Sequence, residues 1–349
     1  MTTAQNDSPS KGSRNDPSVL IAGCGSIGRR HARVLREVGV TDLRACDPLP
    51  AQRDALSRET PVRMYSSYEE ALADRPGTVF VCTPPKLHIP MALQALASGA
   101  HVFCEKPLSD TSRGLDELVA ASQRTGRQVM TGLCFRYHAG LLRAKRLLER
   151  GEFGRLVGIR CLVGEHFPTV RPDYRTLFSA KYGGAFDLTH EVDLALWFAG
   201  LPVNRVRCLA GQCSDVEMEA PDSAEILIGF EGKCLASVHL DFFQMPRRRQ
   251  TELLCTQGVI AVEFSRWDRC TLSTARSDGI WTREEMVTDR DDMFRAEDEA
   301  FLDAISAGRL VECGIDEARK SVEVVERAQA DAGVAVGQEP GSGHVTRDN

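Results

Sequence analysis

The sequence lacks the patterns that usually bind a metal. Its twelve cysteines are scattered from Cys24 to Cys313, without a CxxC pair or a cysteine–histidine spacing that suits zinc. Several of them lie inside apolar runs, which is typical of reduced, buried thiols in a cytoplasmic protein. We therefore expect neither a metal site nor a disulfide framework.

Long apolar segments and an excess of positive charge are also missing. No apolar run reaches the roughly 18 residues of a membrane-spanning helix, and residues 1–16 contain no apolar core of a signal peptide. The formal net charge is −6, so we expect no general attraction to nucleic acid or to an anionic membrane. The basic cluster at 247–249 is interpreted as a solvated loop. We expect a cytoplasmic protein with neither nucleic acid nor membrane as partner.

Residues 18–133 show the pattern of a parallel sheet covered by helices. Short β-branched runs alternate with amphipathic stretches, which is typical of βαβ units in a doubly wound α/β fold. The predicted strands are 19–22, 43–46, 79–82, 102–104 and 129–131. The predicted helices are 27–38, 51–58, 68–74, 89–97 and 112–124.

The second half reads as an α+β domain with a mainly antiparallel, open sheet. Strand-like segments follow one another, separated by turn residues and without a helix between each pair. The predicted strands are 156–163, 203–209, 224–230, 235–240, 251–254 and 259–262, and the predicted helices are 139–150, 190–198, 294–305 and 315–330.

A length of 349 residues also favours two domains, because single cores stop growing at about 250–300 residues. We predict a disordered tail at 1–16, a dinucleotide-binding domain at 17–136, a substrate-binding and oligomerisation domain at 137–334, and a disordered tail at 335–349.

A glycine-rich turn joins the first predicted strand to the first helix. Gly23, Gly25 and Gly28 form the pattern GxGxxG, with Ser26 and Ile27 between the last two glycines. The first glycine permits a tight turn, the second lets the backbone approach a pyrophosphate, and the third lets helix and strand pack closely. The N–H groups and dipole of the helix start favour the anion. In this context the turn predicts a Rossmann domain.

Asp47 is predicted to contact the ribose of the dinucleotide. It ends the second predicted strand, 19 residues after Gly28, where a carboxylate accepts hydrogen bonds from ribose hydroxyls and repels the additional phosphate of NADP. NAD is therefore the expected cofactor. NADP stays open, because the nearby Arg53 can neutralise a phosphate. The alternative is that Asp47 and Pro48 only start a turn.

Thr83, Pro84 and Pro85 follow the next long apolar strand and precede a helix. The prolines restrict the backbone as it leaves the carboxyl edge of the sheet, where ligands of doubly wound folds bind. We assign these residues and His88 to the cofactor site. The alternatives are that Thr83 caps the turn and that His88 only starts the helix.

Glu105, Lys106 and Pro107 form an EKP triplet after a predicted strand. With the glycine turn, the Thr-Pro-Pro segment and the segments 132–138 and 183–193, this triplet resembles the Gfo/Idh/MocA family, which includes glucose-fructose oxidoreductase and inositol dehydrogenases. The resemblance covers residues 19 to about 330. It implies that Glu105 and Lys106 belong to the cofactor site, that Lys106 faces the reacting hydroxyl, and that the bond before Pro107 can be cis. The alternative is a surface ion pair between Lys106 and Glu105.

Asp187 and His190 lie in the second family-like segment. If a helix begins near Asp187, the two side chains share one face, so the carboxylate can orient and stabilise the imidazole. A histidine that titrates near neutral pH suits a general base for a hydroxyl proton. We expect His190 to be the base and Asp187 its partner, both beside the substrate. The alternative makes Asp187 a helix N-cap and His190 a buried helix residue.

Four further residues are candidate substrate neighbours. Arg136 and His138 belong to the segment 132–138, which resembles the family's entry into the substrate site. Tyr174 and Arg175 precede the glycine pair in a polar stretch and could reach substrate hydroxyls or an acidic group. The alternative for the last two is a solvated loop.

The expected function is hydride transfer between a nicotinamide cofactor and a secondary hydroxyl of a sugar, a nucleotide sugar or a cyclic polyol. One alternative is a non-catalytic dinucleotide-binding sensor of the same fold. Another is an enzyme that retains its cofactor and shuttles hydride between two sugars. The apolar strands of the second domain favour a homodimer or homotetramer formed through that sheet.

Overall fold

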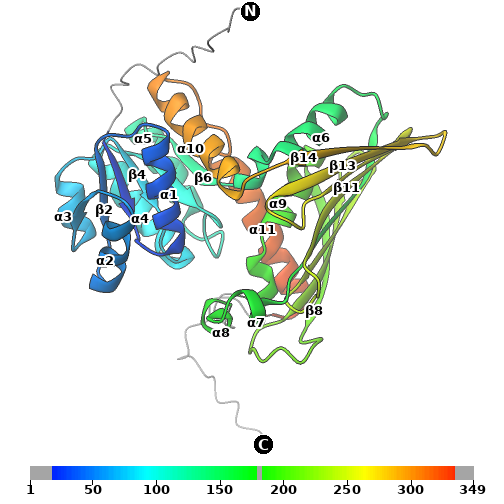
Figure 1. Cartoon of the computed structure of the whole chain (residues 1–349), viewed down its shortest axis with the longest axis horizontal. Coiled ribbons are helices and arrows are strands. Elements are labelled where there is room, and N and C mark those ends of the chain that lie inside the picture. The colour runs from blue at the N-terminus through cyan, green and yellow to red at the C-terminus, as the bar shows by residue number, and fades with distance from the viewer. Residues whose placement is uncertain (1–17, 179–182, 335–349) are drawn as a thin grey trace, which may run out of the picture.

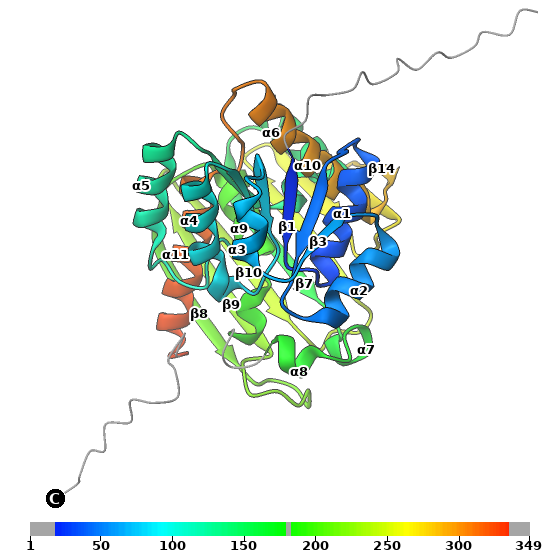
Figure 2. The same cartoon turned by 90° about the vertical axis from the view of Figure 1, so that its left-hand side faces the viewer.

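The computed structural model describes residues 18–178 and 183–334, and the tails predicted at 1–16 and 335–349 lie outside these residues. The first part contains a six-stranded parallel sheet in the order β3-β2-β1-β4-β5-β6, with helices packed against it (Figures 1 and 2). The order reverses between β1 and β4, as in dinucleotide-binding Rossmann folds. The strands are β1 Val19–Ala22, β2 Leu43–Cys46, β3 Arg63–Tyr65, β4 Thr78–Val81, β5 His101–Glu105 and β6 Val129–Gly132. The helices are α1 Ser26–Glu37, α2 Pro50–Glu59, α3 Tyr68–Ala73, η1 Pro85–Leu87 (a 3₁₀ turn), α4 His88–Ser98 and α5 Leu115–Thr125.

Most predicted bounds in this part are within one residue of the observed ones, whereas β3 and the start of α5 differ more. The edge strand β3 has only three residues and no apolar run, so no sequence pattern marks it. Helix α5 starts at Leu115 rather than at 112, because Gly114 adopts a left-handed conformation with φ of +84° directly before it.

The second part contains an eight-stranded sheet in the order β14-β13-β12-β11-β7-β10-β9-β8. Its neighbouring strands are antiparallel except for β7 and β10, which run parallel. The strands are β7 Leu156–Gly164, β8 Val203–Gly211, β9 Ser223–Phe230, β10 Cys234–Asp241, β11 Arg248–Cys255, β12 Gly258–Glu263, β13 Arg269–Arg276 and β14 Trp281–Val287. The helices are η2 Cys134–Tyr137, α6 Ala139–Glu149, α7 Phe167–Val170, α8 Tyr174–Leu177, η4 Gly184–Asp187, α9 His190–Ala199, α10 Arg290–Ser306 and α11 Ile315–Asp331.

The predicted fold class is confirmed, whereas the hairpin of β13 and β14 was missed. β14 is exposed along most of its length and carries a charged centre, so it shows no alternation of apolar and polar residues. Helices α6, α9 and α11 cover one face of the large sheet, and no helix of the described chain covers the opposite face (Figure 1).

The last two helices return to the first sheet and complete its core. Alternate residues of β1 point to opposite faces: Ile21 joins the core that includes Phe301 of α10, whereas Leu20 joins the core that includes Val322 of α11. An isolated bridge between Met130 and Gly314 adds a backbone contact there. The two faces of the N-terminal sheet are therefore partly covered by C-terminal helices.

All twelve cysteines are free, and ten of them are buried as expected, whereas Cys213 is exposed and Cys255 is partly buried. No helix in the described ranges has the length and the apolar composition needed to cross a membrane. Within the same ranges no group of three histidine, cysteine or carboxylate residues could hold a metal ion.

Candidate functional site

The glycine turn lies between β1 and α1 at the carboxyl edge of the Rossmann sheet. A Cβ on Gly23, whose φ is +100°, would lie 2.7 Å from the carbonyl oxygen of Cys82, and a Cβ on Gly28 would lie 1.9 Å from that of Gly23. Nothing lies within 4 Å of a Cβ built on Gly25. No side chain caps the first turn of α1, which also has no acidic residue. This open, uncapped helix start fits a dinucleotide pyrophosphate.

Asp47 leaves the neighbouring strand β2 at the same edge. Its carboxylate accepts hydrogen bonds from the backbone N–H groups of Cys24 and Leu49, each at 2.8 Å. Arg53 donates to the carbonyl oxygens of Asp47 and Pro48 at 2.7 and 3.0 Å. These contacts form the turn considered as an alternative. Each carboxylate oxygen still has a lone pair that a ribose hydroxyl can use, so the geometry fits both interpretations.

His88 was predicted as a cofactor neighbour, but it is fully buried under the β4–α4 turn. Its Nδ1 lies 2.8 Å from the carbonyl oxygen of Pro107 and its Nε2 lies 2.7 Å from that of Thr83. Burial lowers the pKa of His88, and these two uncharged carbonyl groups do not offset it. The structure thus gives His88 the role of joining the Thr-Pro-Pro turn to the EKP triplet.

Glu105 likewise has a different role from the predicted one. It is buried, its Oε1 lies 2.9 Å from Nε2 of His31, and its Oε2 accepts a hydrogen bond from the backbone N–H of Lys106 at 3.0 Å. Both carboxylate oxygens therefore serve contacts within the protein. The Lys106–Pro107 peptide bond is cis, as the resemblance implied.

Lys106 reaches the second half of the chain. Its Nζ donates a hydrogen bond to the backbone carbonyl oxygen of Asp187 at 3.2 Å. The charge of Lys106 also acts to lower the pKa of both Asp187 and His190. The Lys106 ammonium of the Rossmann domain therefore lies next to η4 and acts electrostatically on His190 of α9.

His190 is the first residue of α9 and is partly buried. Its ring packs edge-on against Phe135, with 4.6 Å between the ring centroids. Burial, followed by the charges of Lys106, Arg249 and Arg290, lowers the pKa of His190 well below its usual value. Its buried Nδ1 has no hydrogen-bond partner. The imidazole is therefore neutral, which is the form that accepts a proton, but its pKa lies well below the neutral range that was predicted.

The predicted pairing of Asp187 with His190 is wrong. Gly183 and Gly184 both have positive φ and turn the chain into η4, which ends at Asp187, whereas α9 is a separate helix with Thr189 as its N-cap. No hydrogen bond in the described structure joins the two side chains, and Asp187 is not the N-cap either. Burial raises the pKa of Asp187 to about 8, against the opposing charge of Lys106. Near neutral pH its carboxyl group is therefore mostly protonated.

Arg136 was predicted to contact the substrate, but its buried guanidinium forms hydrogen bonds within the protein instead. Nε and Nη2 donate to the two carboxylate oxygens of Asp193 at 3.0 and 2.6 Å, and Nη1 donates to Glu317 at 3.4 Å. Arg136 thus joins η2 to α9 and α11.

His138 shares the neighbour Phe135 with His190. It precedes α6, its ring centroid lies 5.1 Å from that of Phe264, and its buried Nδ1 has no partner. Burial and the charge of Arg249 lower the pKa of His138 to about 4. His138 is therefore an uncharged imidazole at neutral pH.

Tyr174 and Arg175 belong to α8 and contact the chain that follows β8. The hydroxyl of Tyr174 donates to the carbonyl oxygen of Glu217 at 3.1 Å, and Arg175 forms an ion pair with the Glu217 side chain. Tyr174 also packs in a small apolar cluster with Phe167 and Phe242. Tyr174 is therefore a packing residue, whereas Arg175 is exposed and paired.

The interpretation of 247–249 as a solvated loop is wrong. Alternation along β11 turns Arg249 inward, where Nε and Nη2 donate to Glu191 at 2.5 and 2.9 Å. Its guanidinium carbon lies 4.1 Å from the ring centroid of Phe135, and that of Arg247 lies 4.3 Å from the centroid of Trp267. The strand predicted at 251–254 thus begins earlier, at Arg248, and includes Arg249.

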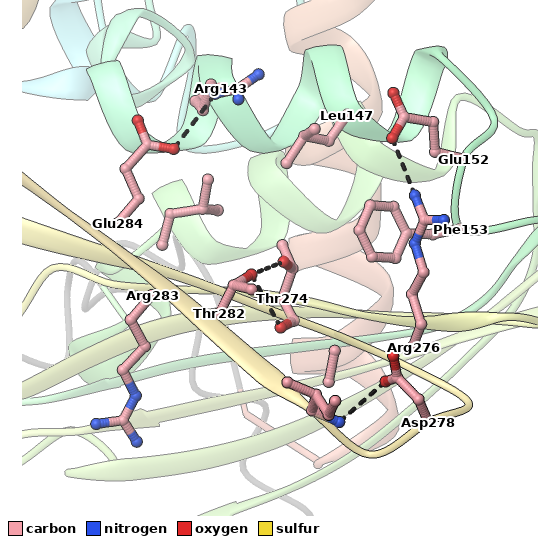
Figure 3. Close-up of a pocket in the computed structure, with 13 residues that line it drawn as sticks. Arg143, Leu147, Glu152, Phe153, Thr274, Arg276, Asp278, Thr282, Arg283 and Glu284 are labelled. Atoms are coloured by element: carbon pink, nitrogen blue, oxygen red, sulfur yellow. Dashed lines mark hydrogen bonds and ion pairs between the residues drawn. The ribbon is translucent and has the colours of Figure 1, made fainter.

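A pocket of about 410 Å³ lies elsewhere, between α6 and the β13–β14 hairpin. Figure 3 shows that charged residues of its wall pair with one another, Arg143 with Glu284 and Arg276 with Glu152. None of the predicted site residues lines this pocket. We therefore do not assign it to the chemistry.

Two family descriptions match this chain. Residues 18–133 match the oxidoreductase family with an NAD-binding Rossmann fold, and residues 141–261 match the Gfo/Idh/MocA C-terminal domain. The chain belongs to the Gfo/Idh/MocA family, whose N-terminal domain is an NAD-binding Rossmann domain.

Curated relatives include inositol 2-dehydrogenases. The inositol 2-dehydrogenase of Salmonella typhimurium is 30% identical over 184 residues, which are 51% of this chain and 53% of that protein. The uncharacterized oxidoreductase YrbE of Bacillus subtilis is 26% identical over 264 residues, which are 73% of this chain and 76% of that protein. The chain thus matches about half the length of these inositol dehydrogenases.

Solved structures share the fold over most of the chain. An oxidoreductase from Agrobacterium radiobacter, in complex with NAD+, L-tartaric acid and magnesium, has a TM-score of 0.81 at 18% identity and covers 91% of this chain and 96% of its own. The WlbA dehydrogenase from Bordetella pertussis, in complex with NADH and UDP-GlcNAcA, has a TM-score of 0.78 at 21% identity and covers 92% and 96%. These likenesses establish the architecture.

Proposed function

We propose that this chain is an NAD-dependent dehydrogenase acting on a secondary hydroxyl, or the corresponding ketone, of a sugar, a nucleotide sugar or a cyclic polyol. The convergence of the Lys106 ammonium and the neutral His190 imidazole carries the proposal. A protein that only sensed a dinucleotide would use the glycine turn but would have no need for these two groups beside each other.

The carboxyl edge of the Rossmann sheet supplies the cofactor contacts in this proposal. Gly25, Ser26 and Ile27 present backbone N–H groups to the pyrophosphate, Asp47 accepts hydrogen bonds from the ribose, and Thr83, Pro84 and Pro85 extend along the same edge. When bound, the nicotinamide supplies the hydride acceptor. Arg53 leaves NADP as a second cofactor to test.

His190 and Lys106 have different roles at the substrate oxygen. His190, held neutral by burial and by neighbouring cations, takes the hydroxyl proton. The Lys106 ammonium stabilises the negative charge that develops on that oxygen, and its hydrogen bond to the Asp187 carbonyl group holds it in place. Asp187, mostly protonated near neutral pH, contributes a hydrogen-bonding carboxyl group, and His138 provides an uncharged ring beside the substrate.

The substrate class is supported by the relatives as well as by the site. The inositol 2-dehydrogenases act on a cyclic polyol by their name, and WlbA was solved with UDP-GlcNAcA. We propose a polyhydroxylated substrate of this kind and withdraw Arg136 and Tyr174 from its contacts.

Alanine substitution of Lys106 and of His190 tests the mechanism. We expect turnover to fall by ~10²–10⁴ in each variant, as is usual when a general acid or base is lost. NADH affinity, measured by fluorescence titration, stays close to that of the wild type. The exposed Lys86 provides the control variant Lys86→Ala, and near-normal turnover in Lys106→Ala or His190→Ala refutes the assignment.

A substrate panel of sugars, inositols and nucleotide sugars, assayed with NAD and with NADP at the nicotinamide absorbance band, precedes these measurements. Tight binding of NAD that no compound of the panel reduces would favour the sensor instead. Cofactor that survives dialysis would point to the enzyme that shuttles hydride between two sugars.

We also propose a cytoplasmic homodimer or homotetramer. Twelve free thiols suit a reducing compartment. The uncovered face of the large sheet carries exposed Leu209, Leu227 and Leu235, which support contact with a second copy.

A further inference from the structure

Three buried ionisable side chains form a row between α10 and the EKP triplet. His31 of α1 is fully buried; its Nδ1 lies 2.9 and 3.0 Å from the carboxylate oxygens of Asp298, and its Nε2 lies 2.9 Å from Oε1 of Glu105. Carboxylates can only accept hydrogen bonds, so a hydrogen bond on each side places a proton on each ring nitrogen. The row consists of a carboxylate, an imidazolium and a second carboxylate.

The two carboxyl groups and three aromatic rings form the surroundings of the His31 imidazole. Burial alone would lower the pKa of His31, but Asp298 and Glu105 raise it to about 10. Aromatic rings of Phe80, Phe103 and Phe294 pack against the imidazole, with centroids 5.1–5.6 Å from its own.

Glu297, next to Asp298 on α10, acts on the row, as do the thiols of Cys82 and Cys104 and the carboxyl group of Glu299. Glu297 is fully buried, neither of its carboxyl oxygens has a hydrogen-bond partner, and burial raises its pKa well above the usual value. Glu297 is therefore neutral and adds no charge to the row.

The row ends at the backbone of Lys106. The second carboxylate oxygen of Glu105 accepts the Lys106 N–H at 3.0 Å. Gly132 leaves room for this carboxyl group, because a Cβ there would lie 3.3 Å from Glu105 Cδ. One end of Lys106 is thus held by Glu105, and its Nζ meets the carbonyl oxygen of Asp187.

We propose that His31 and Asp298 are positioning residues for Lys106. The buried imidazolium holds the Glu105 carboxylate in the orientation that fixes the Lys106 peptide, so α10 determines where the ammonium lies. Only the kinetic part of this inference rests on the proposed function, because the placement of Lys106 can be measured without a substrate.

Chemical labelling tests the placement directly. The full-length wild type and the variants His31→Gln and Asp298→Asn are treated briefly with acetic anhydride, and acetylation of Lys106 relative to the exposed Lys86 is measured by mass spectrometry. We expect the Lys106 ratio to rise severalfold in both variants. Phe301→Leu on the same helix is the control, because Phe301 packs on Phe80 and Phe103 without a polar contact to the row.

Acetylation of Lys145 shows whether a variant has lost its folded structure as a whole. Its Nζ donates to the carbonyl oxygen of Trp197, remote in sequence from the row, so its labelling stays unchanged in a folded variant. An unchanged Lys106 ratio in folded His31→Gln and Asp298→Asn overturns the proposal.

If both variants fail to fold, the charge of the His31 ring is measured instead by nitrogen NMR of the histidine rings in a protein that retains His31. The background for this measurement is His88→Gln, His239→Gln, which removes the other histidine with a raised pKa and the other histidine with an oxygen acceptor at each ring nitrogen. In that background one imidazolium must persist at a pH near 8.5. Its absence overturns the proposal, and its presence supports it.

Kinetics then connect the row to turnover. Displacement of a catalytic group by about 1 Å can slow a reaction on the order of 10²-fold, so we expect kcat to fall by about 10- to 100-fold in both variants, with little change in the KM for NAD. Phe301→Leu keeps its kcat. If the wild type turns over no substrate, the proposed function fails, while the labelling result still decides the positioning role.

Discussion

The buried Arg249–Glu191 pair includes the residue that follows the predicted base His190 in α9. Removing one partner of a buried ion pair leaves an uncompensated charge, which costs about 3–5 kcal/mol. We expect Arg249→Met and Glu191→Gln each to lower the free energy of unfolding by about this amount, measured by urea denaturation. The double variant recovers part of the loss because no lone charge remains.

An exposed pair provides the comparison. Arg276 and Glu152 pair at 3.0 Å away from the uncovered sheet face, with both side chains exposed, and such pairs contribute at most about 1 kcal/mol. Arg276→Met therefore changes the free energy of unfolding little. Losses that simply add in the Arg249→Met, Glu191→Gln protein would contradict the pairing.

His31 gives the protein a specific dependence of stability on pH. Its pKa is about 10 in the folded protein, against an ordinary value of 6.5. A pKa raised on folding contributes stability that is complete below pH 6.5 and is lost as the pH rises through about 10. We expect the free energy of unfolding to fall between these limits more steeply in the wild type than in His31→Gln.

His239 is the matched control for this prediction. Hydrogen bonding to Asp241, and then to Glu225, raises its pKa to about 9, but it lies on the partly exposed sheet face. Solvent screens such a site, so His239→Gln changes the slope less. The free energy of unfolding is measured by urea denaturation at each pH. If it changes equally with pH in the wild type and in His31→Gln, His31 carries no charge in this pH range.

The β1–α1 turn allows a test at the level of one element. Nothing occupies the space next to Gly25, whereas a Cβ on Gly28 would collide with the Gly23 carbonyl oxygen at 1.9 Å. We expect Gly25→Ala to keep the melting temperature and to weaken NADH binding, measured by fluorescence titration, because the methyl group fills the space that the pyrophosphate needs.

Gly28→Ala is expected to behave differently, since helix and strand must separate to accommodate its methyl group. We expect the melting temperature of Gly28→Ala to fall. A change in its NADH affinity would therefore not report on the cofactor site alone. If Gly25→Ala binds NADH as tightly as the wild type, the anion does not lie at the start of α1.

Elements with strong local patterns were predicted well, and weak edge elements were not. β1 and β2 have the predicted bounds, and α9 differs from its predicted end by one residue. β3 and β14 are edge strands, and β14 is nearly all exposed. A strand that buries little apolar surface leaves no periodic signal in its sequence.

The whole molecule presents an eight-stranded sheet with one uncovered face (Figure 1). Strand register places Leu209, Leu227 and Leu235 on that face, where they are 80%, 56% and 68% exposed. We expect the double variant Leu227→Glu, Leu235→Glu to dissociate the proposed oligomer, because introduced carboxylates would be buried against their own copies.

Light scattering coupled to size-exclusion chromatography measures that effect. Val287, 94% exposed at the end of the hairpin, gives the control Val287→Glu, which leaves the mass unchanged if the face alone forms the contact. A wild type that elutes as a monomer at micromolar concentration would contradict the proposed assembly.

Local interactions allowed the nucleotide-binding half to be derived from the sequence alone. The glycine turn, the helix start and the alternation of strand and helix depend on neighbours a few residues apart, so spacing reveals them. The roles of His88 and Arg136 could not be derived in this way, because their partners lie 19 and 57 residues away.

Only the tertiary structure determined which charged side chains contact one another. His31 and Asp298 are 267 residues apart, and Lys106 reaches Asp187 over 81 residues. A buried charge needs a partner in space, and the return of α10 to the first sheet supplies that partner, whereas no sequence period encodes a contact between distant segments.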